Sequence, residues 1–235
     1  MTKLTDQLDK SAPVIDIGDS YRVFFDLSST CSGYTIARMN GSKCTIVRVG
    51  AVWFGDDWKH GQKYSYMYNL VCNEFYVTNA ITDIIYEKYS IDINQMNNCL
   101  VVPEMIGAIK AAAFDVSSDP LGVEDIAPTQ WRKILGIVSD KTPKLNKDGS
   151  VMTNKAGKPK HSNEWKKPAI RYIDAAFPNK VPQKIISNIT GNLRGVPHDL
   201  YEAMCICMAW HKKFGVRQFE VADGAFDGAP DVVGE

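Results

Sequence analysis

The sequence has no apolar run of 18 or more residues, so no segment is long enough to cross a membrane as a helix. Residues 1–20 form a polar leader in which charged side chains recur, and they lack the apolar core of a signal peptide. The chain also lacks an excess of either charge, with 27 basic and 27 acidic residues. These features predict neither a membrane-spanning segment nor a signal peptide, and a cytoplasmic location is the expectation.

Paired cysteine motifs are missing as well. The chain has six cysteines, but none are arranged as Cys-x-x-Cys. Their scatter through apolar segments favours reduced, packed thiols over a disulfide or zinc framework.

The zero net charge conceals an uneven distribution. Residues 139–167 carry eight lysines against three acids, a local net charge of +5. Residues 218–235 carry five acids and no base, and we expect this acidic tail to be disordered. The basic segment indicates a surface that can contact a polyanion.

The apolar pattern predicts a single α/β domain over residues 21–217. Three strands at about 22–27, 33–39 and 44–53 form an antiparallel meander, with Asn40-Gly41 as a hairpin turn. Helical spacing predicts a long helix over 64–89 and further helices over 106–117, from 128, over 164–176 and over 199–214. Short apolar runs at 100–104 and 125–127 complete a mixed five-stranded sheet, three strands antiparallel and then parallel, flanked by helices. The lysine-rich segment 138–163 has no apolar period and is predicted to be a mobile insertion.

Carboxylates mark the ends of several predicted elements. Asp26 and Glu104 each follow an apolar strand, and Asp199 and Glu202 lie three residues apart at a helix start. Oxygen ligands of this kind hold Mg²⁺, and a pair of such ions can clamp the two oxygens of a phosphoryl displacement. Acids in a first helical turn also have an ordinary explanation in the helix dipole, and Glu104 after Pro103 could face solvent.

Three motifs in this order resemble those of the RuvC-type Holliday junction resolvases, members of the RNase H-like nuclease superfamily, in the divergent form carried by phages. They are FDLSSTCSGY at residues 25–34, VVPE at 101–104 and HDLYEA at 198–203. The similarity extends from residue 23 to about 214. Two departures are Leu27, where the family more often has Gly soon after the first Asp, and Glu202, where it more often has Asp.

The resemblance implies a homodimeric, metal-dependent endonuclease that cuts four-way DNA junctions in the host cell cytoplasm. It implies two Mg²⁺ or Mn²⁺ ions per site and no nucleotide cofactor. The implied catalytic and metal-binding residues are Asp26, Glu104, Asp199 and Glu202. Residues implied or considered for DNA contacts are Arg132, Lys133, Lys166, Lys167, Lys141 and Lys160. His198 is a second-rank candidate for orienting water or phosphate, Met105 and Ile106 are second-rank candidates for a wedge between bases, and the 64–89 helix is a candidate dimer interface.

Other functions remain open at this point. A nuclease of the same superfamily acting on flaps, other branched DNA or RNA–DNA hybrids fits the same motifs. An actin-like ATPase needs a second Gly-rich phosphate loop, which the chain lacks. The presence of all four carboxylates argues against a non-catalytic DNA-binding module.

Overall fold

A computed structural model describes residues 20–76, 81–89, 100–116 and 121–226 of the chain. The predicted leader therefore lies almost entirely outside the described residues. None of the helices in the described ranges is long and apolar enough to cross a bilayer.

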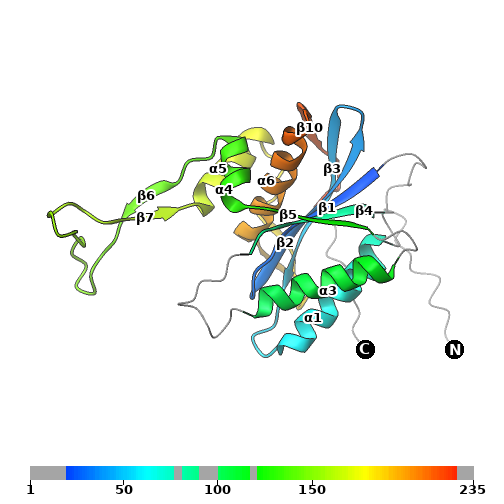
Figure 1. The fold of residues 1–235 in the computed structure, drawn as a ribbon, viewed down its shortest axis with the longest axis horizontal. Helices are drawn as coiled ribbons and strands as arrows, with labels where there is room; N and C mark the ends of the chain where they lie inside the picture. The colour runs from blue at the N-terminus through cyan, green and yellow to red at the C-terminus, as the bar shows by residue number, and fades with distance from the viewer. Residues whose placement is uncertain (1–19, 77–80, 90–99, 117–120, 227–235) are drawn as a thin grey trace.

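One mixed sheet forms the centre of the molecule (Figure 1). Its six strands run in the order β10-β3-β2-β1-β4-β5. The antiparallel meander is followed by β4 parallel to β1 and β5 parallel to β4, and β10 lies parallel to β3. The strands are β1 (Ser20–Asp26), β2 (Cys31–Asn40), β3 (Lys43–Trp53), β4 (Ile81–Glu87), β5 (Gly122–Ile126) and β10 (Gln218–Val221).

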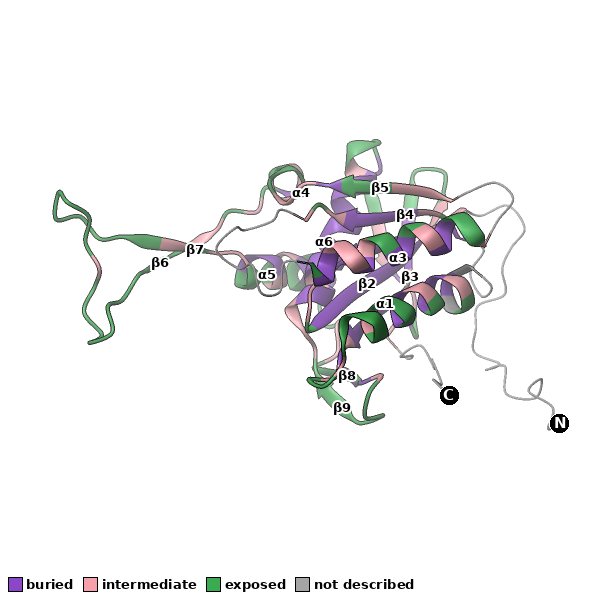
Figure 2. Cartoon of the chain, turned by 60° about the horizontal axis from the view of Figure 1, so that its bottom comes forward, coloured by how far each residue is buried: buried purple, intermediate pink, exposed green. Residues whose placement is uncertain are grey.

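Helices cover both faces of the sheet (Figures 1 and 2). On one face lie α1 (His60–Asn69), the π-helix η1 (Leu70–Tyr76) and α3 (Val101–Asp115); on the other lie α4 (Pro128–Leu135), α5 (Lys166–Ala176) and α6 (His198–Lys213). Strand alternation divides the core accordingly. Phe24 packs with the α4–α6 side, whereas its neighbours Val23 and Phe25 pack with the α1 and α3 side.

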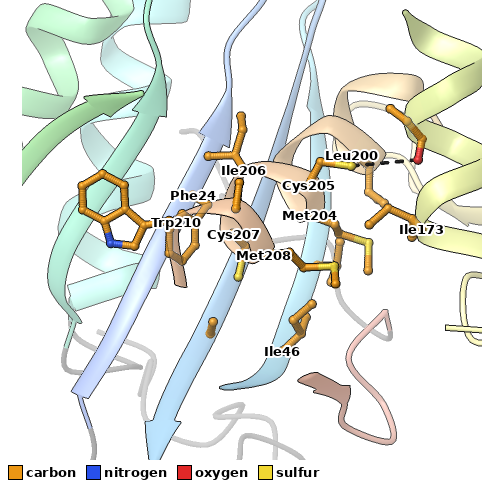
Figure 3. Packing of buried hydrophobic residues seen from close by; sticks show 14 of the residues in the cluster. Phe24, Ile46, Ile173, Leu200, Met204, Cys205, Ile206, Cys207, Met208 and Trp210 are labelled. Atoms are coloured by element: carbon orange, nitrogen blue, oxygen red, sulfur yellow. Dashed lines mark hydrogen bonds between the residues drawn. The ribbon is translucent and has the colours of Figure 1, made fainter. Parts of the chain in front are cut away.

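Helix α6 is the most buried helix because apolar residues occur all around it. Twelve of its sixteen residues are buried, and Met204, Met208 and Leu200 pack with Ile173 of α5 and with the sheet (Figure 3). A helix that is apolar all round belongs inside a protein. This burial fixes the position of both ends of α6.

Two predicted elements have the wrong secondary structure. The helix expected over 64–89 ends at Tyr76, and Ile81–Glu87 forms β4 instead. The strand expected at 100–104 is the start of α3. A parallel strand buried on both faces and a buried helix both present short apolar runs, so spacing alone does not separate them.

The lysine-rich insertion forms an arm that projects away from the sheet (Figure 1). Strand β6 (Asp140–Pro143) pairs with β7 (His161–Glu164), and Arg171 of α5 holds Asp140 at the base through two hydrogen bonds of 2.8 and 2.9 Å. Beyond this ribbon the chain makes two successive turns of the pattern Asn-Lys-x-Gly, at 146–149 and 154–157. The segment predicted to be a loop therefore contains a β-ribbon at its base. A second small hairpin joins β8 (Lys184–Ile186) and β9 (Leu193–Gly195).

The expected acidic tail also begins with structure, because β10 adds a strand to the sheet edge. The carboxylate of Glu220 lies 2.7 Å from Lys43 and accepts a hydrogen bond from Thr45 at 2.7 Å. Residues 227–235 lie outside the described part of the chain.

Candidate active site

Two acids stand side by side at the ends of the central parallel strands. Phe25 of β1 lies opposite Tyr86 of β4, so the next residues along, Asp26 and Glu87, end neighbouring strands at the same edge. Alternation directs both side chains to the face of Phe24 and Ile85, which α6 covers.

The first turn of α6 adds two more acids. Asp199 and Glu202 are three residues apart, which places them on one face of the helix, and both are buried. Asp26 is 7% exposed and shares a hydrogen bond with Glu202. Four carboxylates from β1, β4 and α6 therefore form one group, which we call the carboxylate cluster: Asp26, Glu87, Asp199 and Glu202.

Gly33 permits the approach of α6 to the sheet. It lies opposite Asp26 in β2, and a Cβ atom at this position would overlap the backbone carbonyl of Asp199. The glycine of the sequence motif is thus required by a helix–sheet contact. This contact brings the α6 acids against the strand-end acids.

Burial and mutual repulsion disfavour the charged forms of these acids. Burial raises the pKa of Asp26 well above its usual range, and the charges of Glu202, Glu87 and Asp199 raise it further. Burial raises the pKa of Glu87 to about 7, although a 2.6 Å hydrogen bond from Trp131 Nε1 opposes the shift. Burial likewise raises the pKa of Asp199 to about 6, against a lowering influence from Lys166.

Cationic side chains compensate the cluster only in part. Arg132 Nη2 lies 3.4 Å from Glu202 Oε1, with side-chain exposures of 17% and 11%. The guanidinium also stacks on the rings of Trp131 and Trp165, with its centre 4.8 and 4.6 Å from the ring centroids. Arg132 is therefore held inside the site by Glu202 and two aromatic rings, in the last turn of α4 rather than at its start.

Glu104 does not lie where the sequence predicts. It occupies the first turn of α3, on the face of the sheet opposite α6, and its side chain is 42% exposed. Its carboxylate lies 3.2 Å from His60 Nδ1. The prediction that Glu104 ends a strand is wrong, and the strand-end acid is Glu87.

The second-rank residues have different environments. His198 Nε2 lies 3.4 Å from Asp199 Oδ1 at the start of α6, and burial together with Lys166 lowers the pKa of His198. Met105 is fully buried in the core between α3 and the sheet, and Ile106 packs against the same core. Met105 is therefore a core residue in this structure.

The predicted DNA-contacting lysines are exposed. Lys166 and Lys167 begin α5, Lys133 lies in the last turn of α4, and Lys141 and Lys160 lie on the arm. The helix over 64–89 that was considered as a dimer interface is shorter than predicted, because residues 81–87 form β4 between β1 and β5.

Solved structures of known function share this fold. Thermus thermophilus RuvC in complex with a Holliday junction substrate matches with a TM-score of 0.55 and 13% identity, over 84% of this chain and 98% of that one. A second structure of Thermus thermophilus RuvC matches with a TM-score of 0.53 and 14% identity, over the same shares of both chains. No protein-family model and no curated protein sequence matches the chain. The chain thus shares its fold with Thermus thermophilus RuvC, at a sequence identity of 13–14%.

The raised pKa values predict how stability depends on pH without metal. An acid whose pKa is raised by folding keeps its proton longer in the folded state, so ionisation favours the unfolded chain. In their protonated forms these acids do not destabilise the fold below about pH 4. As pH rises to about 7, the free energy of unfolding falls, because the raised pKa values of Asp199 and Glu87 lie in this range.

We therefore expect Asp26→Asn to raise the melting temperature in EDTA, by an amount that grows between about pH 5 and 7.5. Each pKa unit of relief corresponds to about 1.4 kcal/mol, or about 3–6 °C for a domain of this size. Calorimetry of both proteins across this range measures the difference. A variant that melts no higher than wild type at pH 7.5 would contradict the electrostatic description.

Proposed function

We propose that the protein is a metal-dependent endonuclease that resolves four-way DNA junctions by paired phosphodiester hydrolysis. The observation that carries this proposal is the carboxylate cluster at the strand ends of a RuvC-type fold. Structures with that fold include a RuvC bound to a Holliday junction. Function is assigned from the site and its chemistry, because a fold alone supports many activities.

The donor set fits hard divalent cations. The cluster supplies only carboxylate oxygens, which Mg²⁺ and Mn²⁺ prefer, and their repulsion is relieved by positive charge. Asp26, Glu87, Asp199 and Glu202 would hold two such ions, which supply an activated water and stabilise the leaving oxygen. Asp26 has the charges of the other three acids around it and would be the central ligand of the cluster.

Neighbouring residues have proposed roles of their own. Arg132 anchors Glu202 and balances part of the cluster charge, and thereby positions that carboxylate. The lowered pKa of His198 keeps its imidazole neutral near pH 7, so it can accept a proton or orient water beside Asp199. Lys166, whose charge acts on Asp199, is a candidate to contact a phosphate.

Cleavage of a mobile four-way junction tests the proposal directly. With Mg²⁺ or Mn²⁺, we expect symmetric paired nicks on the junction and none on a linear duplex of the same sequence. Asp26→Asn should bind the junction without cutting it. If the protein cuts flaps or RNA–DNA hybrids in preference to junctions, the assigned substrate is wrong although the nuclease site is right. If it cuts no nucleic acid, the catalytic proposal is wrong and the protein is a DNA-binding module.

Two symmetric cuts need two sites, so we propose that the active form is a homodimer. Analytical ultracentrifugation of the protein alone and with a junction tests this. One copy per junction at saturation would contradict it.

The arm is proposed to contact DNA beyond the cut site. Its stem lysines, Lys141 and Lys160, are exposed, and between them the arm carries four more lysines against the single acid Asp148. Each phosphate that such a lysine neutralises steepens the dependence of affinity on salt by about 0.9 in a log–log plot.

We expect Lys141→Gln with Lys160→Gln to weaken junction binding and to reduce that slope by up to about 2, while single-turnover cleavage at saturation is retained. The matched control replaces Lys110 of α3 and Lys184 of β8, two exposed lysines outside the arm. Fluorescence anisotropy at several salt concentrations measures the slope. If the arm variant and wild type have equal slopes of log affinity against log salt concentration, Lys141 and Lys160 do not contact the DNA phosphates.

A further inference from the structure

A second group of potential ligands lies away from the carboxylate cluster. Cys44 lies in β3, and Cys207 and His211 lie one turn apart in α6. All three are buried, with exposures of 0%, 0% and 1%. Cys207 is drawn within the core packing in Figure 3.

The distances between these side chains are those of ligands around one ion. His211 Nδ1 lies 3.5 Å from Cys44 Sγ and 3.7 Å from Cys207 Sγ. Zinc bonds of about 2.3 Å to sulfur and 2.0–2.1 Å to nitrogen separate the two ligand atoms by about 3.6 Å at a tetrahedral angle and about 3.8 Å at a trigonal one. All three ligand atoms lie within 4.8 Å of one another.

His211 presents Nδ1, not Nε2, to the two thiols. In the metal-free protein Nδ1 can donate a proton to the carbonyl oxygen of Cys207, 3.0 Å away. A cation bound through Nδ1 would replace that hydrogen bond, and the ring proton would then be on Nε2.

The chemistry of Cys44 and Cys207 also suits metal ligands, because a thiol that gives up its proton on binding becomes a thiolate, and the thiolate is the form that binds metals.

We propose that Cys44, Cys207 and His211 bind one thiophilic divalent cation, Zn²⁺ in the first place. Two thiolates and a neutral imidazole around a dication form a group without net charge, which a dry core can accommodate. Thiolate and imidazole ligands together favour zinc over Mg²⁺, so this site and the carboxylate cluster select different metals.

The ion would cross-link the start of β3 to the C-terminal half of α6. The same helix presents Asp199 and Glu202 at its other end. The proposed ion is therefore structural, and it would hold in register the helix that carries half of the carboxylate cluster. Sequence spacing does not reveal this site, because Cys44 and Cys207 are 163 positions apart.

Cobalt binding provides the test, with reduced full-length protein and the Asp26→Asn change to weaken the carboxylate cluster. We expect about one Co²⁺ per chain, a thiolate-to-cobalt absorption band in the near ultraviolet, and loss of the band when Zn²⁺ is added. Cys207→Ser and, separately, Cys44→Ala should lose the band and the bound ion.

Cys205→Ser is the matched control, because Cys205 is equally buried in α6 but its thiol contacts the Ala169 carbonyl instead. This variant should keep the band, and circular dichroism shows whether each variant is folded. The proposal is overturned if folded, reduced protein gives no thiolate band, or if Cys205→Ser loses the band as Cys207→Ser does. The result does not depend on nuclease activity, so it is independent of the proposed function.

Discussion

Glu87→Gln is expected to lower junction cleavage by at least about 100-fold while junction binding is retained. Such a loss corresponds to about 2.7 kcal/mol of activation free energy. Glu87 ends β4 beside Asp26, and its charge interacts with Glu202 and Asp199, so it belongs to the set that would hold the metal ions. The amide keeps the size of the side chain and the hydrogen bond from Trp131 but removes the charge.

Glu104→Gln is the matched control, and we expect its cleavage rate to remain within about threefold of wild type, because surface substitutions usually have small effects. Glu104 lies on the other face of the sheet beside His60. Single-turnover cleavage at saturating enzyme measures both variants, and anisotropy measures their binding. Loss of activity in Glu104→Gln with a fully active Glu87→Gln would show that the carboxylate cluster is not the reaction centre.

The sequence does not mark Glu87 as a strand-end acid, and the reason is physical. The segment ITDIIYE at 81–87 has apolar residues at positions 81, 84 and 85, which fit one face of a helix as well as a strand. Because β4 lies between β1 and β5 with helices on both faces, it has no exposed face to show an alternation. Its β-branched isoleucines were the available signal, together with an acid at the end of the run.

The same ambiguity produced the error at Glu104. Residues 100–104 are apolar and contain Pro103, which fits a strand end but is also tolerated in the first turn of a helix. Elements with an unambiguous pattern were predicted well. The meander has a hairpin turn at Asn40-Gly41, and α6 has the length and apolar content of a buried helix, so the predicted positions of Asp26 at a strand end and of Asp199 and Glu202 at a helix start agree with the structure.

Contacts between distant parts of the chain could not be predicted in this way. The sequence marks Arg132 as a cation near a helix start and suggests DNA contact. In the structure, its guanidinium lies against Glu202 and 4.8 and 4.6 Å from the ring centroids of Trp131 and Trp165. A buried charge needs a partner, but which of the 27 acids supplies it depends on the fold. In the free protein, the charge of Arg132 therefore lies against Glu202.

The position of the α6 acids depends on the absence of a side-chain carbon at Gly33, which lets the start of α6 approach β2. We expect Gly33→Ala to impair both folding and cleavage, since its methyl group would overlap the Asp199 backbone and backbone cannot rotate away as a flexible side chain can. Overpacking of this kind costs about 1–3 kcal/mol. A shift of about 1 Å in the α6 acids would lower the cleavage rate by about 100-fold.

Gly107→Ala separates this contact from a general effect of replacing glycine. Gly107 lies within α3, and an added Cβ there meets no atom within 4 Å. Its replacement should stabilise the protein by about 0.5–1 kcal/mol through helix propensity. Melting temperature and single-turnover cleavage are measured for both variants. If Gly33→Ala is as active and as stable as wild type, α6 does not approach β2 as described, and the placement of Asp199 and Glu202 against Asp26 loses its structural basis.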